Sequence, residues 1–390
     1  MRTRSILSLM LVLILSATGL LAGCGGSPAT PPTTPAATPT PEVAKSPEYG
    51  VHVFLWGSPS VERDLRLAKE AGFTWVKQMF QWNYIEGNGK GKLEWGEPDR
   101  IVKAASKEGL KILARVDISP RWARDQQSDL KVSGPPKNLQ DFGDFMFALA
   151  SRYKKGSSNG QIHAYQIWNE PNLAREWGGR KPNAKEYVEL LKVGYEAVKK
   201  ADPSAVVISA GLAPTTASGA IAVPDVQFLK EMYEAGAKGY FDVLGAHGAG
   251  YKAPPELSPD EVAADPQYNH GEGAAGRIYC FRHVEDLRKV MAQYDDENKK
   301  VAVLEFGWTS DSRPGSPYQW HSVTEEQKAD YVVRAYQYAA KNWAPWIGVM
   351  NLIYICSPEW GPHDEQYYWC ITNPDGTVRP AYDAIKSAPK

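Results

Sequence analysis

The chain has 390 residues, in which 44 basic side chains nearly balance 45 acidic ones and leave a formal net charge of −1. This balance, without any long basic run, argues against a nucleic acid as partner. The 13 tryptophans and 20 tyrosines favour contact with sugars, whose apolar faces stack on aromatic rings.

The first 23 residues are typical of an export signal. Arg2 and Arg4 precede an uncharged apolar run over residues 6–21, which is short for a membrane span. The run ends in Leu21-Ala22-Gly23-Cys24, which resembles the lipobox of bacterial lipoproteins. The resemblance implies a diacylglycerol on Cys24, whereas an ordinary secretory peptide with an incidental cysteine is the alternative. Either way we expect an extracytoplasmic protein, held to the outer or the cytoplasmic membrane through the lipid anchor alone.

A linker follows the signal. Residues 24–48 are rich in Pro and Thr and have too few large apolar side chains to fold. We expect an extended tether of about 3 Å per residue. The remaining residues, 49–390, suffice for one large barrel or two ordinary domains.

An alternation of strand and helix patterns recurs eight times in residues 49–390. The predicted strands are 50–54, 73–79, 111–117, 162–168, 206–210, 241–245, 301–305 and 347–354. Helices are predicted between them: Asn183 with Glu186, and Thr324 with Gln327, are typical of helix starts. Gly72, Gly109 and Gly236 are typical of helix ends.

Strict alternation predicts a parallel sheet with helices outside, either doubly wound or closed. A doubly wound nucleotide-binding sheet has a glycine-rich phosphate loop after its first strand, and residues 55–59 do not show that pattern. We therefore predict an α/β fold of the (β/α)8 TIM barrel type, with its chemistry at the carboxyl ends of the strands.

Two glutamates stand at predicted strand ends. Glu170 follows the fourth strand, and Glu305 ends the seventh, an apolar strand where an unpaired charge is expensive to bury. Either glutamate alone could form a structural salt bridge. Two carboxylates facing each other across a barrel mouth suit double displacement at a glycosidic carbon.

A family resemblance rests on three features: the quartet Trp168-Asn169-Glu170-Pro171, Glu305, and a pattern over residues 72–95. Over residues 50–385 the chain resembles the clan A glycoside hydrolases and is most similar to family 39 and the family 5 cellulase-like enzymes. The resemblance implies a retaining hydrolase with Glu170 as acid/base and Glu305 as nucleophile. It also implies that Asn169 binds the sugar 2-hydroxyl and that His247 orients the nucleophile or a substrate hydroxyl.

Two positions depart from the clan pattern. Lys77 stands where an arginine is usual, so a single point charge replaces a guanidinium that can bind a carboxylate through two hydrogen bonds. A cation there still favours an ionised Glu305. Tyr251 lies four residues after His247, further than the usual tyrosine. The residues expected to bind substrate are Asn169, His247, Lys77, Trp82, Trp177, Tyr251 and Trp308, with Trp56, Trp122, Tyr354 and Trp360 as further aromatic candidates.

No cofactor is expected, and no His and Asp pattern suggests a metal. The rival hypotheses are a lipid-anchored, non-catalytic carbohydrate-binding protein and a barrel without activity. We also expect Trp168 and Pro171 to raise the pKa of Glu170, and Cys356 and Cys370 to form a disulfide. The sugar, the linkage, exo or endo action and the oligomeric state stay open.

Overall fold

The computed structural model describes residues 46–125 and 131–390. The predicted signal peptide, Cys24 and nearly all of the predicted linker lie outside the described residues. Within the described part, no helix is both long and apolar enough to cross a membrane.

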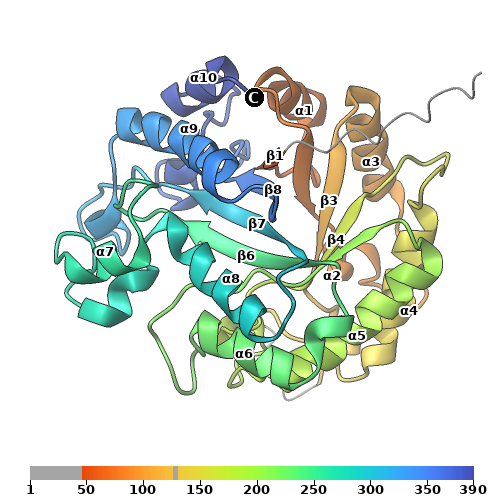
Figure 1. Cartoon of the computed structure of the whole chain (residues 1–390). Helices are drawn as coiled ribbons and strands as arrows, with labels where there is room; N and C mark the ends of the chain where they lie inside the picture. The colour runs from red at the N-terminus through yellow and green to blue at the C-terminus, as the bar shows by residue number, and fades with distance from the viewer. Residues whose placement is uncertain (1–45, 126–130) are drawn as a thin grey trace, which may run out of the picture. The chain divides into compact units, whose positions relative to one another are not determined.

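Eight parallel strands close into a barrel in sequence order, with helices around the outside (Figure 1). The strands are β1 (Glu48–His52), β2 (Trp75–Met79), β3 (Lys111–Val116), β4 (Ala164–Ile167), β5 (Val206–Ile208), β6 (Val243–Ala249), β7 (Lys300–Gly307) and β8 (Ile347–Leu352). Closure is made by β1 on β8, where Gly50 pairs with Asn351. The predicted (β/α)8 barrel and its eight strands are confirmed.

Helices follow the strands as predicted. They are α1 (Val61–Glu70), α2 (Trp82–Ile85), α3 (Gly96–Glu108), α4 (Leu139–Arg152), α5 (Ala184–Ala201), α6 (Asp225–Glu234), α7 (Pro259–Ala264), α8 (Val284–Gln293), α9 (Glu325–Asn342) and α10 (Pro380–Ser387). Short 3-10 turns are η1 (Arg121–Ala123), η2 (Ala174–Glu176), η3 (Ala237–Gly239), η4 (Gly273–Ile278), η5 (Phe281–His283), η6 (Gln319–His321) and η7 (Gln366–Trp369).

The sequence signals at helix ends have the expected geometry. Thr324 and Gln327 form a reciprocal capping box at the start of α9. Asn183 caps α5 through the backbone N–H groups of Lys185 and Glu186. Gly109 ends α3 in the left-handed region, at φ 72°.

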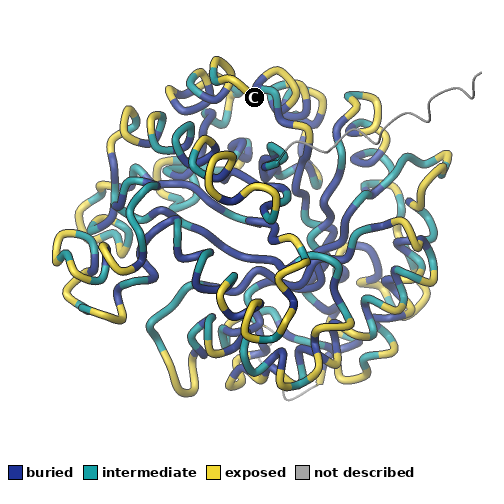
Figure 2. The backbone as a smooth tube through the Cα atoms, viewed as in Figure 1, coloured by how far each residue is buried: buried dark blue, intermediate teal, exposed yellow. Residues whose placement is uncertain are grey.

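The strands are the most buried part of the domain, while the outer faces of the helices are exposed (Figure 2). Six strands contribute to one apolar cluster, made of Trp75, Leu113, Ala164, Ile208, Ala302, Leu304 and Val349. Side chains two residues apart share a face of a strand. Lys77 and Arg115, two residues beyond Trp75 and Leu113, therefore stand one layer nearer the carboxyl ends.

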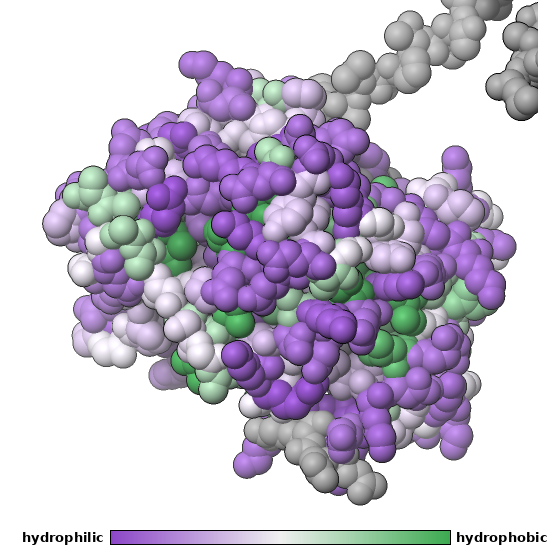
Figure 3. Space-filling model, turned by 60° about the horizontal axis from the view of Figure 1, so that its bottom comes forward, coloured by the Kyte–Doolittle hydropathy of each residue, from purple (hydrophilic) through white to green (hydrophobic). Residues whose placement is uncertain are grey.

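Hydrophilic residues predominate on the face of the molecule shown in Figure 3, where hydrophobic residues form small separate patches. The exposed large hydrophobic residues of the described chain are Tyr84, Phe147, Ile221 and Val378. The cysteines Cys280, Cys356 and Cys370 are buried free thiols. The predicted Cys356–Cys370 disulfide is therefore not formed in this structure.

Candidate active site

Glu170 and Glu305 line one cleft of about 830 Å³ at the carboxyl ends of the strands. Its wall also contains charged, amide and aromatic side chains, among them His52, Phe54, Arg115, Asn169, Arg175, Glu176, His247, Tyr251, Tyr318, Tyr354, Trp360, Glu365 and Trp369. The cleft combines convergent carboxylates with aromatic surface, which suits a carbohydrate.

One oxygen of Glu305 lies within reach of three basic side chains. Lys77 Nζ donates to Oε1 at 2.7 Å. Arg115 Nη1 lies 3.7 Å from the same oxygen, and His52 Nδ1 lies 3.8 Å from it. The predicted contact between Lys77 and Glu305 is thus present.

Strand register produces this cluster. His52 on β1 is the register partner of Lys77 on β2, and Arg115 projects from β3, the next strand. Lys77 is fully buried, and Arg115 Nε is held by Asp117 Oδ2 at 2.6 Å. These charges are therefore fixed in place before any substrate binds.

The surrounding charges decide the ionisation of Glu305. Burial favours the neutral carboxyl, but the attraction of Lys77 and its basic neighbours outweighs it and holds the pKa of Glu305 well below the ordinary value. Burial and the charge of Lys77 hold the pKa of His52 well below the ordinary value, so this imidazole is neutral at neutral pH. Neither ring nitrogen of His52 makes a hydrogen bond within the described residues.

Glu170 is held by residues of another kind. His247 Nδ1 lies 3.1 Å from Oε1, and Arg175 Nη2 donates to Oε2 at 3.0 Å. The loop that carries Glu170 is locally strained, because Trp168 and Glu170 have φ values of 70° and 44°. The Glu170 N–H donates to the carbonyl of Gly211 and fixes the backbone there.

The sequence prediction that the pKa of Glu170 is raised is wrong. Burial does raise the pKa of Glu170, but the hydrogen bond and charge of His247, with the charge of Arg175, bring the pKa below the ordinary value. The apolar neighbours Trp168 and Pro171 do not dominate, because polar groups reach both carboxyl oxygens.

Three of the predicted substrate-binding residues, Asn169, His247 and Tyr251, line the cleft, as do the aromatic candidates Tyr354 and Trp360. Asn169 Oδ1 accepts from Gln166 Nε2 at 3.2 Å, which orients the amide. Lys77 requires a correction. It is fully buried and bonded to Glu305, so its ammonium serves the carboxylate and does not face substrate.

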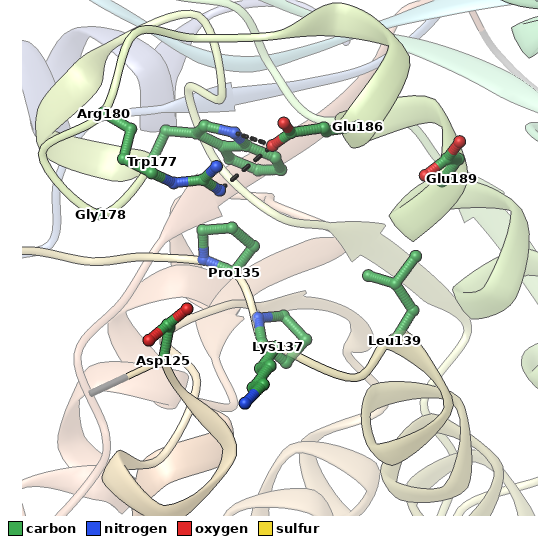
Figure 4. Close-up of a pocket in the computed structure, with 10 residues that line it drawn as sticks. Asp125, Pro135, Lys137, Leu139, Trp177, Gly178, Arg180, Glu186 and Glu189 are labelled. Carbon is green, nitrogen blue, oxygen red and sulfur yellow. Dashed lines mark hydrogen bonds and ion pairs between the residues drawn. The ribbon is translucent and has the colours of Figure 1, made fainter. Parts of the chain in front are cut away.

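Trp82, Trp177 and Trp308 were expected to contact substrate, and the structure places all three in the core. The indole N–H of Trp177 donates to Glu186, which Arg180 also contacts (Figure 4). Trp308 donates to the carbonyl of Ala253 and Trp82 to Glu86. For Trp177 and Trp308, proximity in sequence to a glutamate misled the prediction, because closeness along the chain does not fix which way a side chain points.

Among the cleft residues that the sequence reasoning missed are His52, Arg115, Arg175 and Glu176. His52 ends β1 and Arg115 lies one residue before the end of β3, whereas the predicted strands ran on to residues 54 and 117 and hid these positions. Arg175 and Glu176 lie in η2, where no pattern distinguishes a cleft residue from a solvated one. Among the described residues, no cluster of His, Cys, Asp or Glu is arranged to hold a metal ion.

The model of the cellulase family, glycosyl hydrolase family 5, matches residues 37–351. The chain belongs to this family. It is also 34% identical over 71 residues to a β-xylosidase of Geobacillus stearothermophilus, a stretch that covers 18% of this chain and 14% of that relative.

Solved structures of family 39 share the fold of this family 5 member. A family 39 glycoside hydrolase from the gut symbiont Bacteroides cellulosilyticus WH2 superposes with a TM-score of 0.62 at 21% identity, over 87% of this chain and 62% of that one. A family 39 β-xylosidase from Caulobacter crescentus gives a TM-score of 0.57 at 18% identity, over 87% of this chain and 70% of that one. The chain thus spans less than two thirds of the first of these structures.

Proposed function

We propose that this protein is a retaining β-glycoside hydrolase that cleaves an extracellular oligo- or polysaccharide by double displacement. The observation that carries the proposal is the fixed contact of Lys77 with Glu305 in a cleft that also holds Glu170. A carboxylate kept ionised is suited to attack, and a second carboxyl is then needed to protonate the leaving group.

The reaction takes two steps. Glu305 attacks the anomeric carbon while Glu170 gives its proton to the departing glycosidic oxygen. Glu170 then takes a proton from water, which attacks the same carbon and releases Glu305. Asn169, oriented by Gln166, donates from its amide nitrogen to the sugar 2-hydroxyl, and Tyr354 and Trp360 provide aromatic surface for the rings.

Substitution of each glutamate tests these roles. Glu170→Ala should retain turnover of aryl β-glycosides with good leaving groups, which need no proton, and azide should yield a glycosyl azide of retained configuration. Glu305→Ala should lose activity on every substrate, and azide should yield the opposite anomer. The reverse pattern, or a first wild-type product of inverted configuration by NMR, contradicts the mechanism. Circular dichroism of both variants controls for folding.

The site of action is proposed from residues 1–24, which lie outside the described structure. We propose that lipid on Cys24 holds the enzyme outside the cytoplasm. Cys24→Ser should move the protein from the membrane pellet to the soluble fraction, as measured by fractionation and immunoblotting. A serine variant that stays in the pellet like wild type contradicts the anchor.

A further inference from the structure

Arg175 lies between two carboxyl groups of the cleft. Its Nη2 donates to Glu170 Oε2 at 3.0 Å, while its Nε lies 3.9 Å from Glu176 Oε1. The side chain of Arg175 is 66% exposed, against 15% for Glu170 and 19% for Glu176. The guanidinium is therefore the most exposed of the three charged groups and the one with room to move.

Glu176 is fixed at the cleft wall by its backbone. Its carbonyl accepts from the indole N–H of Trp168 at 3.0 Å, and its own N–H donates to the carbonyl of Leu173. The charges that act on its carboxyl are those of Glu170 and Arg175 from the same loop, of Arg115 on β3 and of Asp117, which follows β3. Arg115 is already bonded to Asp117, so Arg175 is the cation with freedom to approach Glu176.

The two carboxyl groups hold protons differently. Burial, and then the charge of Glu170, raises the pKa of Glu176 to about 7. The pKa of Glu170 is lowered, because contacts from His247 and Arg175 outweigh burial and the charge of Glu305. Near neutral pH, the proton of this pair resides on Glu176.

This distribution conflicts with what the proposed reaction requires. A general acid has to carry its proton when the glycosidic oxygen arrives. Both oxygens of Glu170 have partners, Oε1 the buried His247 and Oε2 the exposed Arg175. The group that an incoming sugar displaces more easily is Arg175.

We propose that Glu176 stores the proton that Glu170 delivers, and that Arg175 moves from Glu170 to Glu176 as substrate enters. One proton passes from the Glu176 carboxyl to the Glu170 carboxylate. The negative charge appears on Glu176, and the guanidinium follows it, so the total charge of the three residues is unchanged. Arg175 and Glu176 act through Glu170 and are positioning residues for its proton.

The inference rests on the proposed glycosidase function, and the pH dependence of Glu176→Gln tests it. Glutamine keeps the shape of the side chain but holds no acidic proton. For a substrate with a poor leaving group, such as a phenyl β-glycoside, the basic limb of the kcat/KM profile should move to lower pH by about one unit or more. At pH 7 this is a loss of about tenfold. A dinitrophenyl glycoside, which needs no proton, should lose less than about twofold.

Three further variants separate proton storage from a structural role. Arg175→Gln should move the basic limb to higher pH, because Glu170 loses its ion pair. Glu176→Asp, which keeps an acidic proton, should have a basic limb between those of Glu176→Gln and wild type. Arg180→Gln, which removes another exposed arginine from the same loop, should leave the profile unchanged. An unchanged limb in Glu176→Gln, or an equal loss on both substrates, overturns the inference.

Carbon-13 NMR of labelled glutamate carboxyls gives a readout without turnover. A carboxyl that titrates near pH 7 should be present in wild type and absent in Glu176→Gln. If this carboxyl is present but wild type hydrolyses no β-glycoside, the proposed function fails and the proton on Glu176 stands. If no such carboxyl titrates, the inference fails whatever the activity.

Discussion

Glu305 and Glu170 line the same cleft, yet the groups that pair with them come from different parts of the barrel. The partners of Glu305 project from β1, β2 and β3 and are buried or tied to other residues. Glu170 is paired with His247 of β6 and with an exposed arginine of the loop after β4. Strands provide a charge environment that does not change, whereas a loop provides one that substrate can rearrange.

This difference matches the two tasks of a retaining hydrolase. A nucleophile has to stay ionised through the reaction, while an acid/base has to gain and lose a proton in each cycle. The structure places buried cations beside the first carboxyl and an exposed cation beside the second.

Removal of the fixed cation should have the largest effect. Lys77→Met leaves Glu305 buried without its closest partner, so we expect a loss of about 3–5 kcal/mol in the free energy of unfolding. The kcat/KM should fall by about 100-fold or more, with an acid limb moved to higher pH. The double variant Lys77→Met, Glu305→Gln should regain most of the stability. An acid limb that does not move would show that Lys77 does not control Glu305.

The contributions of Glu176 and Glu305 to the free energy of unfolding should change in opposite directions with pH. The folded-state pKa of Glu176 is about 7, above its unfolded value, so wild-type stability should fall by roughly 3 kcal/mol as pH rises from 4.5 through 7. The depressed pKa of Glu305 gives stability that is present above pH 4.5 and is lost as pH falls through the folded-state value.

Urea unfolding across these pH ranges measures both effects. Compared with wild type, Glu176→Gln should show a smaller fall between pH 4.5 and 7, and Glu305→Gln should show a smaller fall on the acid side. Parallel stability curves for wild type and Glu176→Gln above pH 4.5 are incompatible with a raised pKa at Glu176.

His247, the buried partner of Glu170, can be displaced by a substitution at Gly211. A Cβ on Gly211 would lie 2.2 Å from His247 Nε2, so Gly211→Ala should push the imidazole away from Glu170. Gly211→Ala should therefore lower kcat/KM about 10- to 100-fold for substrates with poor leaving groups, which is the effect of losing one hydrogen bond to a charged group. Gly361→Ala, whose Cβ would meet no atom within 4 Å, is the matched control. Equal activity of the two variants argues against a role for His247.

The aromatic wall should give the smallest effect. Trp360 contacts the rings of Phe54 and Tyr354 and lines the cleft. Loss of one stacking interaction of about 1.5 kcal/mol corresponds to a rise in KM of about tenfold for Trp360→Ala, with kcat changed less. Trp177→Ala should lower the midpoint of thermal unfolding without raising KM, because this indole lies in the core. A rise in KM for Trp177→Ala would instead indicate that this indole contacts the substrate.

The periodicity of the sequence was enough to predict the eight strands, the barrel and the two glutamates at strand ends. These features depend on local patterns, because alternation along a strand and glycine after a helix are visible within a few residues. The prediction of Lys77 beside Glu305 also held, because all strands of a closed parallel barrel present their carboxyl ends at one rim, where β2 and β7 face each other across the mouth.

Side-chain direction and pairing were decided by the tertiary structure. Trp177 and Trp308 follow the glutamates closely in the chain, yet they pack into the core. Against the effect of burial, His247 and Arg175 lower the pKa of Glu170, whereas burial and the charge of Glu170 raise the pKa of Glu176 against the attraction of Arg115 and Arg175. The sequence by itself therefore determined the barrel and the two glutamates at its mouth. The tertiary structure decided which other side chains line the mouth. Which of them share a proton depends on distances that exist only after the barrel has closed, since electrostatic interactions fall off over a few ångströms of intervening protein and water.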